Sequence, residues 1–114
     1  MQNMIKIFKA LSDSNRIRIL KMLELRQLCL CEIREVLNLA NSTVSKHLSI
    51  LREAELIIDE KEGKWVNFYL NREHNNEYTR HLVPLIRTWL PADETIMEDQ
   101  KKVKSVDRNK MCNI

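Results

Sequence analysis

Residues 41–70, NSTVSKHLSILREAELIIDEKEGKWVNFYL, decide the fold of this chain because they predict a helix that leads directly into a β-hairpin. In the first half, Val44, Leu48 and Leu51 recur at helical spacing and form one apolar stripe. The opposite face carries small hydroxyl and amide side chains together with a lysine. This half therefore predicts a helix that buries one side and presents a small, polar surface on the other.

The second half of the stretch predicts the hairpin. Two runs rich in β-branched and aromatic residues, 57–61 and 65–70, flank Glu62-Gly63-Lys64. Gly63 is the single glycine of the chain and stands at the tip, where a positive φ is needed. We therefore expect two short antiparallel strands joined by a tight turn.

Outward from this stretch, apolar periodicity predicts further helices over residues 4–11, 14–23, 32–37 and about 72–90. Asp13 is placed to cap the second of them, and Asn38 stands where a helix ends in the left-handed conformation. In the second helix, Arg16, Arg18 and Lys21 are expected to point mainly outward. A short helix, a tight turn, a second helix and a hairpin form the plan of a winged helix-turn-helix, so we expect a mainly α fold with one small hairpin.

Composition limits the class of protein. The 114 residues fit one domain, which we expect over residues 1–91, followed by a charged tail over 92–114 that forms a loose helix at most. No run approaches 18 apolar residues, and the first residues lack a signal peptide, so membrane insertion and secretion are not expected. Three cysteines, an odd number, suit a reducing cytoplasm rather than a disulfide framework.

The polar face of the helix that begins at Asn41 is interpreted as a DNA-reading surface. Small polar side chains near the start of a recognition helix let it enter the major groove and bond base edges and phosphates. A solvated amphipathic helix is the alternative, and the hairpin that follows favours DNA binding. The residues expected at the DNA are Asn41, Ser42, Thr43, Ser45, Lys46 and His47 on the helix, and Lys61 and Lys64 on the hairpin.

Two cysteines one residue apart, Cys29 and Cys31 in QLCLCEI (27–33), mark a candidate metal or metalloid site. On a regular helix, positions i and i+2 lie about 200° apart, so both thiols could face one ion only if the first turn unwinds or never forms. Ligand binding would then compete with the helix-turn-helix for the same backbone. The helix dipole is expected to favour the thiolate form. Two small hydrophobes packed in the core are the alternative.

The third ligand of such a site is left open. Cys112 is the only other thiol of the chain, and a thiol from solution could equally complete the site. His47 is interpreted as a packing or DNA-proximal residue rather than a ligand. His74 and His81 on the last predicted helix are weak zinc candidates.

Four segments carry a resemblance to a known family: FKALSDSNRIRIL (8–20), LCLCEI (28–33), STVSKHLSILREAELI (42–57) and EGKWVNFYL (62–70). Over about residues 4–90 the chain resembles the ArsR/SmtB family of metal-sensing repressors, in particular its arsenic-responsive branch. The resemblance implies a homodimer built from the first and last helices, which binds operator DNA. It also implies that the DNA is released when As(III) binds, with Sb(III) as an additional inducing ligand. Two positions depart from the pattern: Ala40 replaces a frequent Ser cap, and Arg34 replaces a third cysteine.

Two recognition helices must meet successive major grooves, so we expect a symmetric dimer on a palindromic operator. The candidate interface residues are Met4, Ile7, Phe8, Leu11, Leu82, Leu85, Ile86 and Trp89. Competing functions are a winged-helix repressor that senses Cd, Pb, Zn or redox state through the same cysteines, and an enzyme. The βαβ context of dithiol redox folds is missing, and a single glycine excludes a phosphate-binding loop, so an enzyme is not expected.

Overall fold

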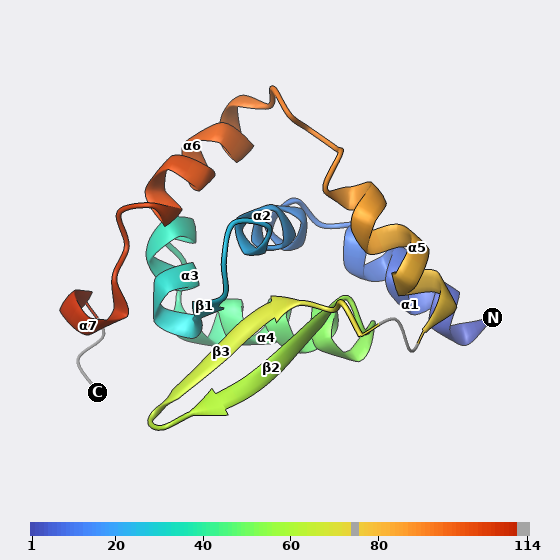
Figure 1. Cartoon of the computed structure of the whole chain (residues 1–114), viewed down its shortest axis with the longest axis horizontal. Coiled ribbons are helices and arrows are strands. Elements are labelled where there is room, and N and C mark those ends of the chain that lie inside the picture. The colour runs from blue at the N-terminus through green and yellow to red at the C-terminus, as the bar shows by residue number, and fades with distance from the viewer. Residues whose placement is uncertain (74–75, 112–114) are drawn as a thin grey trace.

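The computed structural model describes residues 1–73 and 76–111 and is mainly helical, with a small antiparallel sheet (Figure 1). The helices are α1 (Gln2–Leu11), α2 (Ser14–Leu23), α3 (Leu30–Leu37), α4 (Asn41–Glu53), α5 (Glu77–Ile86), α6 (Glu94–Val103) and α7 (Arg108–Met111). The strands are β1 (Leu28–Cys29), β2 (Ile57–Glu62) and β3 (Trp65–Leu70). Among the described residues, no helix is long and apolar enough to span a bilayer.

The predicted helix-turn-helix is confirmed in α3 and α4. Helix α3 ends at Asn38, whose φ of 56° and ψ of 50° place it in the left-handed region that Asn tolerates. The chain then turns into α4, which buries the predicted stripe of Val44, Leu48 and Leu51 in the core. Burial of this stripe against the other helices fixes which side of α4 faces the solvent.

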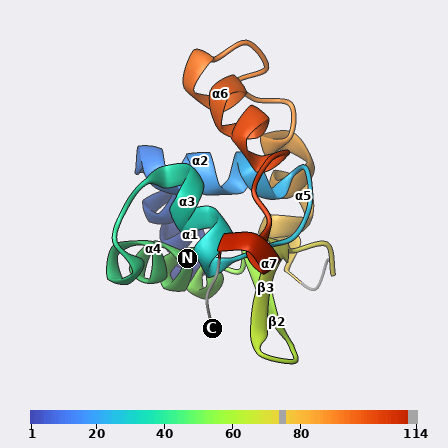
Figure 2. The ribbon, with the colours of Figure 1, turned by 90° about the vertical axis from the view of Figure 1, so that its left-hand side faces the viewer.

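The predicted hairpin is also confirmed, and it projects away from the helices as a wing (Figure 2). Strands β2 and β3 pair antiparallel up to Glu62 opposite Trp65, which leaves a two-residue turn with Gly63 at φ +59°. The sheet has a third strand that the sequence did not predict: β1 pairs with β3, with Cys29 opposite Asn67. Two residues are too short for a recognisable strand pattern.

The last predicted helix, over residues 72–90, is wrong at both ends. Helix α5 begins only after Asn76, whose side chain accepts hydrogen bonds from the amides of Tyr78 and Thr79 and so caps it. It ends at Ile86, before the predicted stop at Pro91. The capping side chain, rather than the apolar spacing, sets where this helix starts.

The C-terminal segment is more ordered than the expected loose helix. Helix α6 packs on α2 and α3 (Figure 1). Its own residues Ile96 and Val103, seven positions apart, are buried. Its Asp99 is buried and accepts two hydrogen bonds from Arg18, at 2.7 and 2.9 Å. The division into a domain over residues 1–91 and a tail over 92–114 stays a prediction, but residues 94–103 pack as a regular helix.

Lys21 corrects another expectation, since it is buried rather than outward. Its Nζ lies 2.6 Å from the Glu24 carboxylate and donates to the Ile86 carbonyl at 3.2 Å. A buried ammonium is tolerable when acceptors surround it, and these contacts supply them. The positive charge of Lys21 thus contacts groups inside the molecule rather than the solvent.

Candidate DNA-binding surface and dithiol site

Helix α4 presents the predicted polar face to the solvent. Asn41, Ser42, Thr43, Ser45 and Lys46 are all exposed, on the side opposite the buried stripe. The helix begins after Ala40, and among the described residues no side chain caps its N-terminus. Uncapped amides at a helix N-terminus suit a phosphate, since the dipole also favours negative charge there.

His47 differs from the other polar residues of α4, because it is half-buried and has a partner inside the molecule. Its Nδ1 lies 3.1 Å from Nη1 of Arg16. The Arg16 Nε in turn donates to the Ala10 carbonyl at 2.8 Å. The structure therefore gives His47 a packing role between α4 and α2, one of the two roles that the sequence left open.

The wing carries the other predicted cations. Lys61 and Lys64 are exposed, and the Lys64 Nζ lies 5.0 Å from the centre of the Trp65 ring. A second cation, Arg108 from α7, lies 4.9 Å from the same ring centre. Trp65 is thus held between the wing turn and the C-terminal segment, a contact with the tail residues that the sequence did not predict.

The two cysteines lie where strand β1 passes into α3. Cys29 ends β1 and is the N-cap of α3, with extended dihedrals of φ −88° and ψ 168°, and Cys31 belongs to the first helical turn. Their Sγ atoms are 3.4 Å apart. Of the two arrangements that the sequence allowed, the structure has the one in which no helical turn includes both cysteines, because Cys29 lies outside the helix and the 100° step per residue does not apply to it.

The expectation that the helix dipole favours the thiolate form fails for Cys29. Burial raises the pKa of the Cys29 thiol, and the nearby Glu32 carboxylate raises it further by its charge and hydrogen bond. Hydrogen bonds from the amides of Cys31 and Glu32 act in the opposite direction but do not outweigh burial. Desolvation, rather than the helix dipole, governs this thiol.

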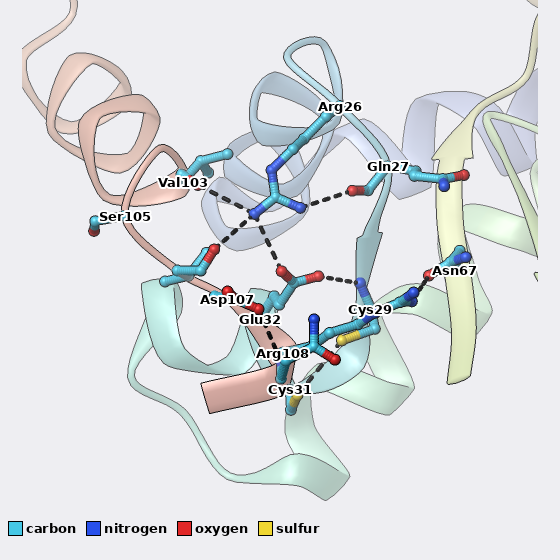
Figure 3. A network of polar contacts seen from close by, with 12 residues as sticks. Arg26, Gln27, Cys29, Cys31, Glu32, Asn67, Val103, Ser105, Asp107 and Arg108 are labelled. Atoms are coloured by element: carbon cyan, nitrogen blue, oxygen red, sulfur yellow. Dashed lines mark hydrogen bonds and ion pairs between the residues drawn. The ribbon is translucent and has the colours of Figure 1, made fainter. Parts of the chain in front are cut away.

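Glu32 is a part of the site that the sequence reasoning missed (Figure 3). Its Oε1 accepts the backbone N–H of Cys29 at 3.0 Å, and its Oε2 accepts from Arg26 at 3.1 Å. The signal was present in the spacing: Cys29-x-x-Glu32 is a capping box with Cys in place of Ser or Thr. This pair holds Cys29 at the end of β1.

A groove of about 670 Å³ joins Cys29 and Cys31 to the exposed polar face of α4. It runs between α3, α4 and the wing, and its lining includes Cys29, Cys31, Arg34, Asn41, Ser45 and Lys64. Two groups of residues that the sequence proposed separately thus share one cavity. Any molecule or ion held by the sulfurs lies beside the side chains that would meet DNA.

Arg34, which stands where a third thiol was expected, also lines this groove. Among the described residues, its buried Nε has no hydrogen-bond partner. The described residues contain no cluster of three or more His, Cys, Asp or Glu side chains suited to a metal ion. The predicted third ligand, Cys112, and the zinc candidate His74 lie outside the described residues, and His81 is exposed on α5.

Comparison with known proteins places these features in a family. The sequence profile described as "Bacterial regulatory protein, arsR family" matches residues 13–59. An "Arsenical resistance operon repressor" from Escherichia coli (strain K12) is 35% identical over 108 residues, which cover 92% of this chain and 82% of that protein. A "Cadmium resistance transcriptional regulatory protein CadC homolog" from Staphylococcus aureus is 39% identical over 70 residues, 60% of this chain and 58% of that protein.

Among solved structures, the chain is similar to the homodimeric winged helix-turn-helix DNA-binding domain Mb0332 from Mycobacterium bovis, described as a possible ArsR-family transcriptional regulator. The TM-score is 0.64 at 21% identity, and the match covers 75% of this chain and 76% of that chain. At this identity the likeness shows the fold, which is the winged helix-turn-helix expected from residues 41–70.

Proposed function

The chain belongs to the ArsR family of bacterial regulatory proteins, and we propose that it is a repressor which leaves its operator when arsenite or antimonite binds Cys29 and Cys31. The family and the relative from Escherichia coli establish the broader role, a DNA-binding transcriptional repressor rather than an enzyme. The relative's name concerns arsenical resistance, which supports the choice of ligand.

One observation carries the proposal: the sulfurs of Cys29 and Cys31 lie 3.4 Å apart in a groove that Asn41 and Ser45 also line. In the reduced protein, two adjacent thiolates are a soft donor pair, which suits a thiophilic ion better than a hard one. A ligand held there occupies space between the recognition helix and the wing. The metalloid and the operator DNA would both use this groove. They therefore compete, and each weakens the binding of the other.

The third donor is proposed to be either Cys112 or a thiol from solution. Arg34 cannot serve, since a guanidinium has no lone pair to give. A tail donor predicts that Cys112→Ser weakens metalloid binding, whereas a solution thiol predicts that binding depends on added glutathione instead. Titrating both proteins with arsenite, with and without glutathione, separates the two.

The DNA side of the proposal rests on the exposed face of α4 and on the wing. Asn41, Ser42, Thr43, Ser45 and Lys46 are proposed to meet base edges and phosphates, and Lys61 and Lys64 to meet the flanking backbone. His47 is proposed to support this face through Arg16 rather than to read bases. The functional unit is proposed to be a homodimer on a palindromic operator.

A second candidate function is sensing of another soft ion by the same sulfurs. The relative from Staphylococcus aureus is named for cadmium resistance, and Cd²⁺ also prefers thiolate donors. Lead, zinc or a redox change at the cysteines would use the same groove. Selectivity therefore has to be measured on this chain.

The experiment is a competitive release assay under reducing, anaerobic conditions. DNA from upstream of the gene for this chain is labelled, and its fluorescence anisotropy is followed while arsenite, antimonite, Cd²⁺, Pb²⁺ or Zn²⁺ is added. Release at the lowest concentration by arsenite or antimonite supports the proposal. Release by Cd²⁺ with no response to arsenite would replace it with the second candidate, and peroxide-driven release alone would indicate a redox sensor.

A further inference from the structure

Arg26 joins three segments of the chain at the dithiol site (Figure 3). Its Nη2 donates to the Glu32 carboxylate at 3.1 Å and to the carbonyls of Val103 and Val106 at 3.2 and 2.9 Å. The first of these partners belongs to α3, and the other two close the end of α6 and the turn after it. One guanidinium thus ties the C-terminal segment to the start of α3.

Glu32 carries this connection to the cysteine. Its side chain is almost fully buried, with 4% of the residue exposed, so its charge requires partners at both oxygens. One oxygen accepts a hydrogen bond from the Arg26 guanidinium, and the other accepts one from the Cys29 N–H. The position of the Cys29 backbone is therefore bound to the position of Arg26.

The far end of the same C-terminal segment, helix α7, contacts the wing. Arg108 of α7 donates to the Asn67 side chain and to the Glu62 carboxylate, each at 2.7 Å, and its guanidinium faces the Trp65 ring. Asn67 is the residue that pairs with Cys29 across the sheet. Strand β3 is thus held from two sides, by β1 and by α7.

From these contacts we propose that Arg26 and Glu32 are positioning residues of the dithiol site, which pass a displacement of Cys29 to the C-terminal segment and, through Arg108, to the wing. The inference rests on the proposed function, since it needs a ligand at the sulfurs. The route from the ligand to the wing then runs through the C-terminal segment and does not pass through α4. The partners are arranged so that Cys29 cannot shift without breaking its bond to Glu32 or moving Glu32 and Arg26 with it.

The route has a physical consequence that can be measured. If ligand binding loosens the grip of Arg108 on the wing, the environment of Trp65 changes although Trp65 itself binds nothing. Ligand and operator weaken each other's binding by the same factor. A variant in which the C-terminal segment is held less firmly is expected to change that factor. Loss of the relay is expected to reduce arsenite-driven release by about fivefold or more, the lower bound of typical coupling between sites.

The test uses the full-length dimer labelled with 5-fluorotryptophan. The chain has two tryptophans, so its ¹⁹F spectrum has two signals, which Trp65→Phe assigns. Arsenite binding is measured in parallel by titration calorimetry. In the parent protein, arsenite is expected to shift the Trp65 signal, and in Arg26→Ala and Glu32→Gln it is expected to bind while that shift is lost.

Three further variants complete the test. Lys104→Ala removes an exposed cation from the same cavity as Arg26 and is expected to retain the full shift. Should Arg26→Ala fail to fold, Arg26→Lys, which keeps the charge but loses the planar guanidinium, and Arg108→Gln take its place. Both are expected to weaken the shift.

The outcomes separate this inference from the proposed function. If the parent protein does not bind arsenite, the proposed function is wrong, and this inference falls with it. If arsenite binds but the Trp65 signal does not move, or moves equally in Arg26→Ala and Glu32→Gln, the proposed function stands and the relay is overturned.

Discussion

Ser45 and Lys46 stand side by side on the exposed face of α4, away from the core, so their loss should affect DNA binding alone. We expect Ser45→Ala/Lys46→Ala to weaken operator binding by about 1–3 kcal/mol per lost base contact and to lower the salt slope by about one for the lost phosphate contact. Arsenite affinity should not change, because neither side chain is a sulfur donor.

The measurement is operator affinity by anisotropy at several salt concentrations. Glu53→Ala, an exposed residue at the far end of the same helix, is the matched control and should bind as the parent does. Undiminished operator affinity in the double variant would place the DNA-reading face elsewhere.

Arg18 and Asp99 form an ion pair between α2 and α6. Asp99 is only 2% exposed, so Arg18→Met leaves a buried carboxylate without its bidentate partner. We expect a loss of about 3 kcal/mol in the free energy of unfolding, at the lower end for such pairs because Arg18 is partly exposed. Arg52→Met, which breaks the exposed pair with Asp59, should cost less than about 1 kcal/mol. Equal losses in urea unfolding would show that burial of Asp99 does not govern the pair.

The side chains of the site were predictable only in part. Residue spacing identified Cys29 and Cys31, and apolar periodicity identified the exposed face of α4, because both signals are local. The short sulfur–sulfur distance was not predictable, since it depends on strand β1, which exists only through its pairing with β3. Lys21 was misplaced for a similar reason: its acceptor on α5, the Ile86 carbonyl, lies far away in sequence.

The N-terminus of α2 depends on one acidic cap, Asp13. Burial opposes the charge of its carboxylate, but the backbone N–H groups of Arg16 and Asn15 donate to it and, with the charges of Arg16 and His47, lower its pKa. A lowered pKa in the folded state stabilises the protein above the pKa of the unfolded chain, and that stabilisation disappears as the pH falls through the folded value.

Two substitutions separate the cap from its charge. Asp13→Ala removes both and should cost about 1 kcal/mol at pH 7. Asp13→Asn keeps an acceptor and loses the charge, so it should cost less at pH 7, and its difference from the parent should shrink as the pH falls below the unfolded pKa and through the lowered folded pKa of Asp13. Urea unfolding of the three proteins at pH 7 and near pH 3 checks this. A difference between parent and Asn variant that persists at low pH would contradict the role given to the charge.

Among the secondary-structure elements, most of those fixed by local chemistry were predicted, except the start of α5 at its cap Asn76, and those fixed by distant contacts were not. Asn38 and Gly63 marked the end of α3 and the turn of the wing because few residues accept a positive φ. Helix α6 was expected to be loose, since charged residues dominate its sequence. Its stability comes from Ile96 and Val103 in the core and from the bond of Asp99 to Arg18, which no local pattern reveals.

The proposed homodimer requires an exposed apolar surface outside the core, and α1 and α5 offer one at the end of the molecule opposite α7 (Figure 1). Phe8 is 60% exposed and Leu85 is 50% exposed, as suits an interface. Ile7 and Ile86, two of the predicted interface residues, are instead buried in the core of the monomer. The interface is therefore proposed to centre on Met4, Phe8 and Leu85.

We expect Phe8→Glu/Leu85→Glu to be monomeric at micromolar concentration and to bind operator weakly, because two recognition helices must act together. Met97→Glu is the control, since Met97 is 55% exposed on α6, away from this surface, and the variant should remain dimeric. Sedimentation velocity with parallel operator titrations measures both properties. A parent protein that sediments as a monomer while binding operator tightly would refute the dimer.

The account as a whole depends on the sulfurs of Cys29 and Cys31 in the groove that they share with the recognition helix. The most direct test is arsenite-driven release of operator DNA from the parent protein and from Cys29→Ser/Cys31→Ser, after both are shown to bind the operator equally in its absence. We predict release of the parent and retention of the double variant at every arsenite concentration, because a site without its sulfur pair has no soft donors to hold the metalloid. A double variant that releases the operator as readily as the parent would contradict the account.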